Sequence, residues 1–387
     1  MSGDRARASV DVGAIERNCS RLRSELREGV ELCAVVKADG YGHGAVHSAR
    51  AAVAGGAGWL AVATAQEARE LREAGLTAPR VLVMGALTGA ELSEALAAEA
   101  DVVVWREQDV QAVAAAGGGR VHAKLDSGMG RLGTRDAEQA SQVLAAAQAT
   151  PGVEPVGAMT HFATADELHD GGFFAHQLDT FTRWARAMKA AQPQLLVHAA
   201  NSAAVLRDRA AHFDMVRCGI AVYGMDPFGE DPSARALRPA LELTSYVAEV
   251  KTCRAGESAG YGRRFVADRD TYLGVLPIGY GDGWRRALSN NAEVLVGGRR
   301  HPLVGTVSMD NITIELGADE RALRLRGESA TLIGVQGGER ITAEDVARRL
   351  GTINYEVTCA LTPRVPRVYY RGGARARQPT GEEERRT

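Results

Sequence analysis

The sequence predicts an α/β fold in which an N-terminal (β/α)8 barrel of the TIM type is followed by a mainly β C-terminal domain. In the first two-thirds of the chain, eight short apolar runs alternate with stretches rich in Ala, Glu and Leu, which favour helices. Near Pro239 the pattern changes to strand-like runs separated by glycine turns. Eight buried strands that alternate with helices are typical of a parallel barrel. A doubly wound parallel sheet is the competing interpretation, because a strand count from sequence is uncertain by about one or two.

The barrel is predicted to open with a helix and then to alternate strands and helices. The opening helix has one apolar face, whose members recur at spacings of three or four: Val12, Ile15, Cys19, Leu22 and Leu26. Stretches such as 65–74 and 90–98 are predicted helices between the strands. The eight predicted strands are Leu32–Lys37, Trp59–Ala63, Arg80–Met84, Asp101–Trp105, Val121–Leu125, Pro155–Thr160, Gln194–His198 and Phe213–Arg217.

The second domain is predicted to be built mainly from strands. One helical stretch, Thr342–Leu350, interrupts them, with Thr342 as its N-cap and Gly351 at its far end. The sequence thus assigns residues 10–238 to the barrel and 239–375 to the β domain, and it predicts that 376–387, rich in Arg and Glu, form a disordered tail. The predicted strands are Leu243–Lys251, Tyr272–Leu276, Glu293–Val296, Pro302–Val307, Ile312–Leu316 and Ala330–Val335.

Length and composition limit the classes of protein. A chain of 387 residues is longer than one hydrophobic core usually organises, which favours two domains. A formal net charge of -2 gives no reason to expect nucleic acid or an anionic membrane as a partner. The five cysteines are scattered and form no C-x-x-C pair, which argues against a disulfide framework or a metal site and fits a reducing cytoplasm. Since no stretch reaches the ~18 apolar residues of a membrane span, we expect a cytoplasmic protein.

The segment from Val36 to Gly44 is the most informative part of the chain. An apolar run delivers Lys37, and a turn with three glycines in five residues follows. An apolar stem partly desolvates a lysine, which lowers its pKa and makes the amine a usable nucleophile and base. Glycines let the backbone approach an anion closely. The combination indicates a Schiff-base lysine beside a phosphate, as in pyridoxal phosphate (PLP) chemistry, although a lone lysine of this kind is more often a solvated strand end.

Reactive side chains also follow other predicted strands of the barrel. Lys124 ends the fifth strand, His161 follows the sixth and His198 ends the seventh. Ser202 comes shortly after His198, and Arg217 ends the eighth strand just before Gly219 and Ile220. Barrel enzymes place catalytic groups at the C-terminal ends of the strands, often with a phosphate site after strands seven and eight. The sequence therefore predicts an active site on this rim.

Several motifs along the chain, spanning about Arg5 to Tyr370, resemble the alanine racemase family. They are Val36–Gly44, Asp126–Gly133, Thr160–Asp166, Asn201–Ala204, Val216–Ile220, Gly260–Gly262, Pro277–Gly283, Val307–Asp310 and Ile353–Glu356. The resemblance implies a PLP enzyme with a barrel followed by a β domain, which residues 1–9 join. It also implies that the enzyme interconverts L- and D-alanine and supplies D-alanine for peptidoglycan.

The resemblance further implies two bases, one on each face of the substrate Cα. Lys37 would be the first, and Tyr261 would be the second, contributed by the other subunit of a head-to-tail homodimer. A tyrosine has a normal pKa of about 10, so this pKa must be lowered or coupled to a partner. Arg217 would face the cofactor's pyridine nitrogen. Since an arginine can only donate a proton in a hydrogen bond, we expect a weaker electron sink and fewer side reactions. His161 would orient Arg217.

The remaining roles implied by the resemblance concern the phosphate and the substrate. The phosphate ligands would be Tyr41, Ser202, the amides of Gly219 and Ile220, and Tyr355. Arg131 would contact both the cofactor and the substrate carboxylate, and Lys124 stands where some family members carry a carbamylated lysine. Met309 and Tyr280 would line the substrate entrance from the partner subunit, although a packing methionine and a core-edge tyrosine are the alternatives.

Three rival functions compete with alanine racemase, and the sequence argues against the second and the third. An amino-acid racemase of broader specificity is hard to exclude, because pocket width is a three-dimensional property. A PLP-dependent amino-acid decarboxylase of similar layout needs a carboxylate at the pyridine nitrogen and a cysteine proton donor, whereas Arg217 and Tyr261 stand in those roles here. A non-catalytic PLP-binding barrel would lack the β domain.

Overall fold

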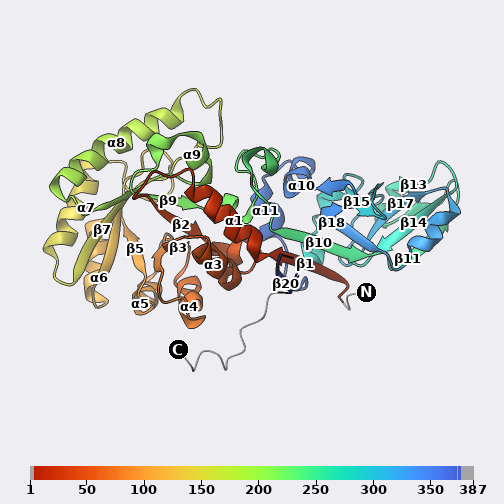
Figure 1. The fold of residues 1–387 in the computed structure, drawn as a ribbon, viewed down its shortest axis with the longest axis horizontal. Coiled ribbons are helices and arrows are strands. Elements are labelled where there is room, and N and C mark those ends of the chain that lie inside the picture. The colour runs from red at the N-terminus through yellow and green to blue at the C-terminus, as the bar shows by residue number, and fades with distance from the viewer. Residues whose placement is uncertain (1–3, 373, 376–387) are drawn as a thin grey trace. The chain divides into compact units, whose positions relative to one another are not determined.

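The computed structural model describes residues 4–372 and 374–375, and it divides them into two compact units (Figure 1). Residues 15–238 form the barrel domain, and the β domain comprises the described residues up to Ala14 and from Pro239 onward. The sequence sets the first boundary after residue 9, whereas here the division follows Ala14. The tail predicted for 376–387 lies outside the described residues.

The barrel is a closed ring of eight parallel strands. Each strand pairs with the next along the chain, and β2 pairs with β9 to close the ring. The prediction of a (β/α)8 barrel is therefore confirmed, and the doubly wound sheet is excluded. The strands are β2 Glu31–Val35, β3 Trp59–Val62, β4 Arg80–Val83, β5 Asp101–Val104, β6 Gly119–Lys124, β7 Val153–Met159, β8 Leu196–His198 and β9 Met215–Cys218.

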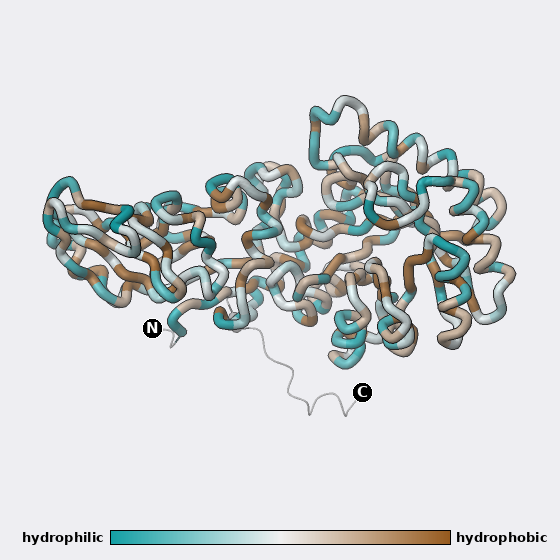
Figure 2. Tube along the Cα trace, turned by 180° about the vertical axis from the view of Figure 1, so that it is seen from behind, coloured by the Kyte–Doolittle hydropathy of each residue, from teal (hydrophilic) through white to brown (hydrophobic). Residues whose placement is uncertain are grey.

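Helices surround the ring of strands (Figure 1), and hydrophobic stretches alternate with hydrophilic ones along the chain (Figure 2). Two helices begin with capping boxes, in which Thr64 and Thr88 accept from the amides of Glu67 and Glu91. The helices are α1 Val12–Arg23, α2 Lys37–Tyr41, α3 Ala45–Ala54, α4 Ala65–Glu73, α5 Gly89–Ala97, α6 Glu107–Ala115, α7 Ala137–Ala149, α8 Phe173–Ala191 and α9 Ser202–Arg207. Short 3-10 turns follow at η1 Arg209–Ala211, η2 Ile220–Tyr223 and η3 Pro232–Arg235.

The apolar face predicted for the first helix is buried along α1. Val12, Ile15, Cys19 and Leu22 are all buried, and the fifth predicted member, Leu26, lies beyond the last helical residue and is half-buried.

The β domain contains an eight-stranded sheet, a three-stranded sheet and a two-stranded ribbon. In the large sheet, β1 Ala6–Asp11 lies between β10, to which it is antiparallel, and β20, to which it is parallel. The other strands of this sheet are β10 Leu241–Tyr246, β15 Glu293–Val296, β16 Arg299–Pro302, β18 Ser329–Gln336, β19 Glu339–Ile341, β20 Arg367–Arg371 and β21 Ala374–Arg375. The three-stranded sheet is β11 Glu249–Cys253, β14 Thr271–Leu276 and β17 Ile312–Gly317, and the ribbon is β12 Ser258–Ala259 with β13 Phe265–Val266.

The β domain contains the helix that the sequence predicted and further helical elements that it did not predict. Helix α10 Ala343–Leu350 has Thr342 as its N-cap and a left-handed Gly351 at its end, as predicted. A second helix, α11 Asn354–Cys359, was not predicted. The 3-10 turns are η4 Tyr261–Arg263, η5 Tyr280–Asp282, η6 Arg286–Leu288 and η7 Glu320–Leu325.

Two strand predictions in the β domain are wrong in detail. The run predicted as one strand, 243–251, divides into β10 and β11, which belong to different sheets. No strand covers the predicted range 302–307. The observed strand β16 ends at Pro302, and beyond it only Leu303 forms an isolated bridge, to Ile314. Gly305 has a left-handed φ of 78°, which breaks the extended backbone there.

Among the described residues, we find no helix that combines the length and the apolar character needed to cross a membrane.

Candidate active site

The turn that follows β2 positions Lys37 at the C-terminal end of the strand. Lys37 begins α2, but the next residues are left-handed, with φ values of 53° at Ala38 and 50° at Asp39. Such a backbone is unfavourable for residues that carry a Cβ, so it must be held by its surroundings. The Glu67 carboxylate accepts from the Ala38 amide at 2.6 Å, and Asp39 accepts from the Ala45 amide at 2.9 Å. The lysine therefore starts a turn that is anchored at two points.

The four predicted phosphate ligands of the barrel lie together beside this turn. Ser202, the first residue of α9, accepts through its hydroxyl from the Gly219 amide at 3.0 Å. A Cβ built on Gly219 would lie 2.3 Å from the Tyr41 hydroxyl, so only glycine leaves room there. Ile220 follows as the first residue of η2 and is buried. Because β2 pairs with β9, the Tyr41 turn and the Gly219 turn leave neighbouring strands.

Arg217 is buried in the barrel, with only 2% of its surface exposed, and its guanidinium is held by hydrogen bonds from its two terminal nitrogens. One terminal nitrogen donates to His198 Nδ1 at 2.7 Å. The other donates to the carbonyls of Thr160 at 2.8 Å and Ala199 at 3.0 Å, and to His161 Nδ1 at 3.2 Å. Burial lowers the pKa of Arg217 to about 10, so it stays charged at neutral pH. The contact predicted between His161 and Arg217 is therefore present.

Cations gather at the C-terminal rim of the barrel. Lys124, at the end of β6, is 5% exposed, and burial together with Arg217, Arg131 and Lys37 lowers its pKa to about 8. Burial lowers the pKa of His161 well below its usual value, with the same cations contributing. The rim therefore carries a positive field that favours an anionic ligand.

Arg131 lies in the exposed loop that follows β6. Asp126 shapes this loop, because its carboxylate accepts from the amides of Gly128 and Gly130 at about 3.1 Å. Those bonds, with a salt bridge to Arg135, hold the pKa of Asp126 below its usual range despite its burial.

Three of the four predicted site residues of the β domain lie together. The Tyr261 carbonyl accepts from the Thr306 hydroxyl at 2.7 Å, on the segment that leads to Met309. The Gly281 amide, next to Tyr280, donates to the Met309 carbonyl at 2.9 Å. The side chains of all three are exposed: Tyr261 by 74%, Met309 by 51% and Tyr280 by 42%. The fourth residue, Tyr355, is half-buried on α11.

Glu67, Asp101 and His122 are three further polar residues that were not predicted from the sequence. Glu67 contacts the Lys37 turn, and Asp101 and His122 connect to Arg217 through His198. A signal for the last two was present, because each is a polar residue within an apolar run predicted to be a buried strand.

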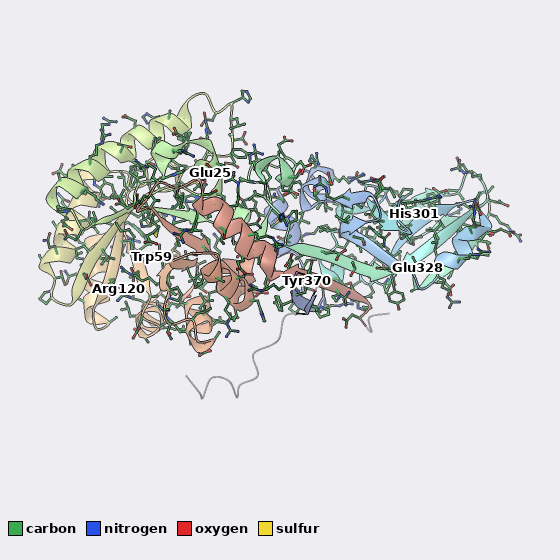
Figure 3. All side chains as sticks on the ribbon, viewed as in Figure 1. Glu25, Trp59, Arg120, His301, Glu328 and Tyr370 are labelled. Carbon is green, nitrogen blue, oxygen red and sulfur yellow. The ribbon has the colours of Figure 1, made fainter. Side chains whose placement is uncertain are left out.

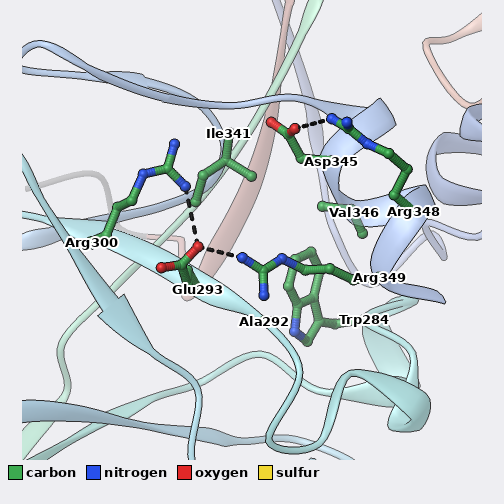
Figure 4. Close-up of a pocket in the computed structure, with 9 residues that line it drawn as sticks. All are labelled: Trp284, Ala292, Glu293, Arg300, Ile341, Asp345, Val346, Arg348 and Arg349. Atoms are coloured by element: carbon green, nitrogen blue, oxygen red, sulfur yellow. Dashed lines mark hydrogen bonds and ion pairs between the residues drawn. The ribbon is translucent and has the colours of Figure 1, made fainter. Parts of the chain in front are cut away.

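A pocket of about 240 Å³ in the β domain contains none of the predicted site residues (Figure 4). Its arginines are matched by acids: Arg300 and Arg349 pair with Glu293, and Arg348 pairs with Asp345. The basic side chains of this pocket are therefore already paired, and it contributes no residue to the predicted site.

Comparison with known proteins covers both domains. Residues 10–227 match the family model "Alanine racemase, N-terminal domain", and residues 240–369 match "Alanine racemase, C-terminal domain". Alanine racemase 1 of Bacillus subtilis is 41% identical over 377 residues, which cover 95% of this chain and 93% of that protein. Alanine racemase of Geobacillus stearothermophilus is 41% identical over 373 residues, which cover 94% of this chain and 93% of that protein.

Solved structures give the same result. The crystal structure of alanine racemase from E. faecalis matches with a TM-score of 0.88 and 39% identity, over 95% of this chain and 99% of that one. The enzyme from D-cycloserine-producing Streptomyces lavendulae matches with a TM-score of 0.89 and 38% identity, over 96% and 98%. The resemblance expected from the sequence motifs is confirmed, and the chain belongs to the alanine racemase family.

Proposed function

We propose that this protein is a PLP-dependent alanine racemase that interconverts L- and D-alanine with two bases, Lys37 and Tyr261 of a second copy of the chain. The observation that carries the proposal is the rim of the barrel, where Lys37 starts a turn that also delivers the Tyr41 hydroxyl to Gly219. Membership of the alanine racemase family supports the same reaction.

The residues on the rim fit a phosphate-bearing aromatic cofactor. The Tyr41 hydroxyl lies where a Cβ on Gly219 would collide, and the Ser202 hydroxyl accepts from the Gly219 amide. Hydroxyl and backbone groups thus lie close together, next to Ile220, in a cradle of the kind that can hold a phosphate. The positive field of the rim favours the same anion. Tyr355 of the β domain is the fifth proposed ligand. When bound, PLP supplies an aldehyde that condenses with amines and a ring that accepts the electrons released at Cα.

Arg217 sets the electrostatic character of this site. Its guanidinium remains protonated and can only donate, so it would face an unprotonated pyridine nitrogen as a hydrogen-bond donor. A neutral ring withdraws electrons less strongly than a protonated one, which limits the lifetime of negative charge and so the side reactions. The bonds to Thr160, Ala199 and His161 keep the guanidinium in one position.

Arg131 is proposed to bind the substrate carboxylate and the cofactor's phenolic oxygen. Lys124 is the proposed carbamylation site beside it. With a pKa of about 8, its amine has a sizeable neutral fraction at neutral pH, and a neutral amine adds CO2 to give a carbamate and a proton. The change from a cation to an anion would remove a repulsion of Arg131 and create an acceptor for it.

Two bases on opposite faces allow a proton to leave Cα on one side and return on the other. Lys37 is proposed to serve one face. Tyr261 is exposed on its own chain, so a head-to-tail homodimer would bring it to the opposite face in a second copy, with Tyr280 and Met309 at the substrate entrance. D-Alanine formed in this way would be supplied for peptidoglycan.

Deuterium exchange at Cα tests the proposal directly. In D2O the protein should wash deuterium into both L-alanine and D-alanine and should release no CO2 from ornithine. Exchange into serine or larger amino acids at comparable kcat/KM would indicate a racemase of broader specificity, and CO2 release would indicate a decarboxylase.

The visible spectrum of the purified protein tests the cofactor anchor. The wild-type protein should show the absorbance of PLP bound to a lysine amine, and Lys37→Ala should abolish that band. If the band persists in Lys37→Ala, Lys37 is not the anchor and the proposal fails.

A further inference from the structure

A chain of buried polar side chains crosses the interior of the barrel and ends on Arg217. At its far end, Asp101 is the first residue of β5, so it lies at the N-terminal ends of the strands, opposite the candidate active site. Its Oδ2 lies 3.0 Å from Nε2 of His122, and Nδ1 of His122 lies 2.8 Å from Nε2 of His198. Nδ1 of His198 lies 2.7 Å from the Arg217 guanidinium. Both histidines and Asp101 are fully buried.

The proton positions in this chain follow from chemistry at either end. Arg217 can only donate, so His198 must present an unprotonated Nδ1 and carry its proton on Nε2. That proton is donated to His122 Nδ1, so His122 carries its own proton on Nε2 and donates it to Asp101. Burial lowers the pKa of both histidines, that of His198 well below its usual value, so each carries a single ring proton at neutral pH. Arg217 at one end and Asp101 at the other therefore require the same tautomers, in which each histidine carries its proton on Nε2.

Asp101 can only accept in this arrangement, because every group around it is a donor. Arg120 Nε donates to Oδ1 at 2.7 Å, and Arg80 donates to Oδ2, the oxygen that also accepts from His122. Burial opposes ionisation of Asp101, but His122 and the two arginines outweigh it and lower its pKa. Arg80 and Trp59 line a cavity of about 400 Å³ at this end of the barrel, and Figure 3 labels Trp59 and Arg120.

The backbone around His122 leaves room for the contact between the His122 and His198 rings. The pairing of β6 with β7 shifts between Val121 and His122, which places Gly157 opposite His122. A Cβ on Gly157 would lie 1.9 Å from His122 Nδ1, the atom that accepts from His198. Trp59 covers the other side, edge-on to the His122 ring at 5.8 Å between centroids. A bulge, a glycine and an aromatic ring thus leave His122 one orientation.

We propose that Asp101 is a positioning residue for the reaction, because it fixes, through His122 and His198, the tautomer that gives Arg217 its acceptor. The effect on the reaction rests on the proposed function, in which Arg217 faces the cofactor ring. The tautomers themselves do not depend on that function. An amide in place of the carboxylate would present an NH2 group among three donors, and the chain of protons could reverse so that His198 Nδ1–H faces Arg217.

Nitrogen-15 NMR of the histidine rings in the cofactor-loaded protein tests the tautomers without any substitution. His122 and His198 should each show a protonated Nε2 and an unprotonated Nδ1. A protonated Nδ1 on either ring would overturn the proposal, whatever the activity of the protein. If the tautomers are as expected but no racemisation occurs, the proposed function fails while the assignment of the chain stands.

Asp101→Asn tests the positioning role, with Asp136→Asn as the matched control. Asp136 is an exposed N-cap of α7, where asparagine caps equally well. Asp101→Asn should shift the Nδ1 resonance of His198, change the visible spectrum of the cofactor, and lower kcat by between about tenfold and a hundredfold with a smaller change in KM. Asp136→Asn should change none of these. A folded Asp101→Asn protein with unaltered His198 resonances and unaltered kcat would overturn the positioning role.

Discussion

The buried cations among the predicted site residues of the barrel and three exposed ones of the β domain have opposite surroundings. In the barrel, Arg217 and Lys124 are almost fully buried, and hydrogen bonds hold the Arg217 guanidinium in place. In the β domain, Tyr261, Tyr280 and Met309 have rigid backbone contacts but exposed side chains.

This difference bears on the proposal that each active site is shared between two chains. Buried polar groups that are satisfied by hydrogen bonds are preorganised and need no partner to take their positions. Exposed large side chains gathered on one surface gain most when another surface covers them. The exposed side chains of Tyr261, Tyr280 and Met309 are therefore what the proposed homodimer would require, since a second copy of the chain would cover them.

Mixing two inactive variants should produce the largest change in activity, and it tests whether the two bases of a site come from different chains. Lys37→Ala removes one base and Tyr261→Phe removes the other, and each should lower kcat by about a hundredfold or more. If the two bases of a site come from different chains, a mixed dimer has one site with both wild-type bases. Random reassociation should then restore about a quarter of the wild-type activity, since half of the dimers are mixed and each has one intact site.

The mixing experiment also has a clear contrary outcome. If both bases came from one chain, every chain in the mixture would lack a base and no activity would return. The rate of racemisation after denaturation and joint refolding, compared with each variant refolded alone, decides between the two arrangements.

The stability of the protein should respond to the buried half and not to the exposed half. Arg217→Met leaves the acceptors on His198, Thr160 and Ala199 without their donor, which should lower the free energy of unfolding by about 2–4 kcal/mol. Tyr280→Ala removes an exposed side chain and should change the free energy by less than about 0.5 kcal/mol. Urea unfolding followed by circular dichroism measures both, and equal effects would contradict the distinction between the two halves.

Acid should lower the free energy of unfolding, because three histidines in the barrel have lowered pKa values. Burial lowers the pKa values of His122, His161 and His198 in the folded protein, so the unfolded chain binds protons first as the pH falls. Stability from these groups is complete above the unfolded pKa of about 6.5 and is lost as the pH falls below it, at about 1.4 kcal/mol per pH unit for each proton taken up.

Urea midpoints between pH 7.5 and 5.5 measure this loss. His198→Gln removes one of the three groups, so its midpoint should fall less steeply with pH than that of the wild-type protein. A slope that is the same in both proteins would show that His198 takes up no proton on unfolding in this range.

The sequence predicted those features that depend on local pattern and strand order. The residues predicted at the ends of barrel strands, such as Lys37, His161 and Arg217, lie on one rim because parallel strands end at the same edge. The cap at Thr342 and the left-handed Gly351 were likewise predictable, because both act within one turn of α10.

Features that depend on long-range contacts could not be predicted from the sequence. The run 243–251 divides between two sheets because its two halves find different partner strands. The left-handed backbone at Ala38 has no local signal, since it is held by Glu67 from the next βα unit. The bond between His122 and His198 needs Gly157 and a bulge on a third strand.

Glu67 provides the smallest and most local test of preorganisation in the barrel half. One oxygen accepts from the Ala38 amide at 2.6 Å, and the other accepts from the amides of Ala63 at 2.8 Å and Thr64 at 3.2 Å. In Glu67→Gln an NH2 group replaces one of these oxygens, so either the Lys37 turn or the start of α4 must lose its acceptor. A small displacement of Lys37 should lower kcat by about threefold to tenfold.

Glu70→Gln is the matched control, because Glu70 lies exposed on the same helix and the change removes the same charge. It should leave kcat unchanged, so the ratio of the two variants isolates the hydrogen bond from the charge. If both variants lowered kcat equally, the effect would come from the loss of a negative charge on α4 and not from the loss of the hydrogen bond to Ala38. The left-handed turn would then hold Lys37 in place without Glu67, and the preorganisation of this half would lie in its backbone alone.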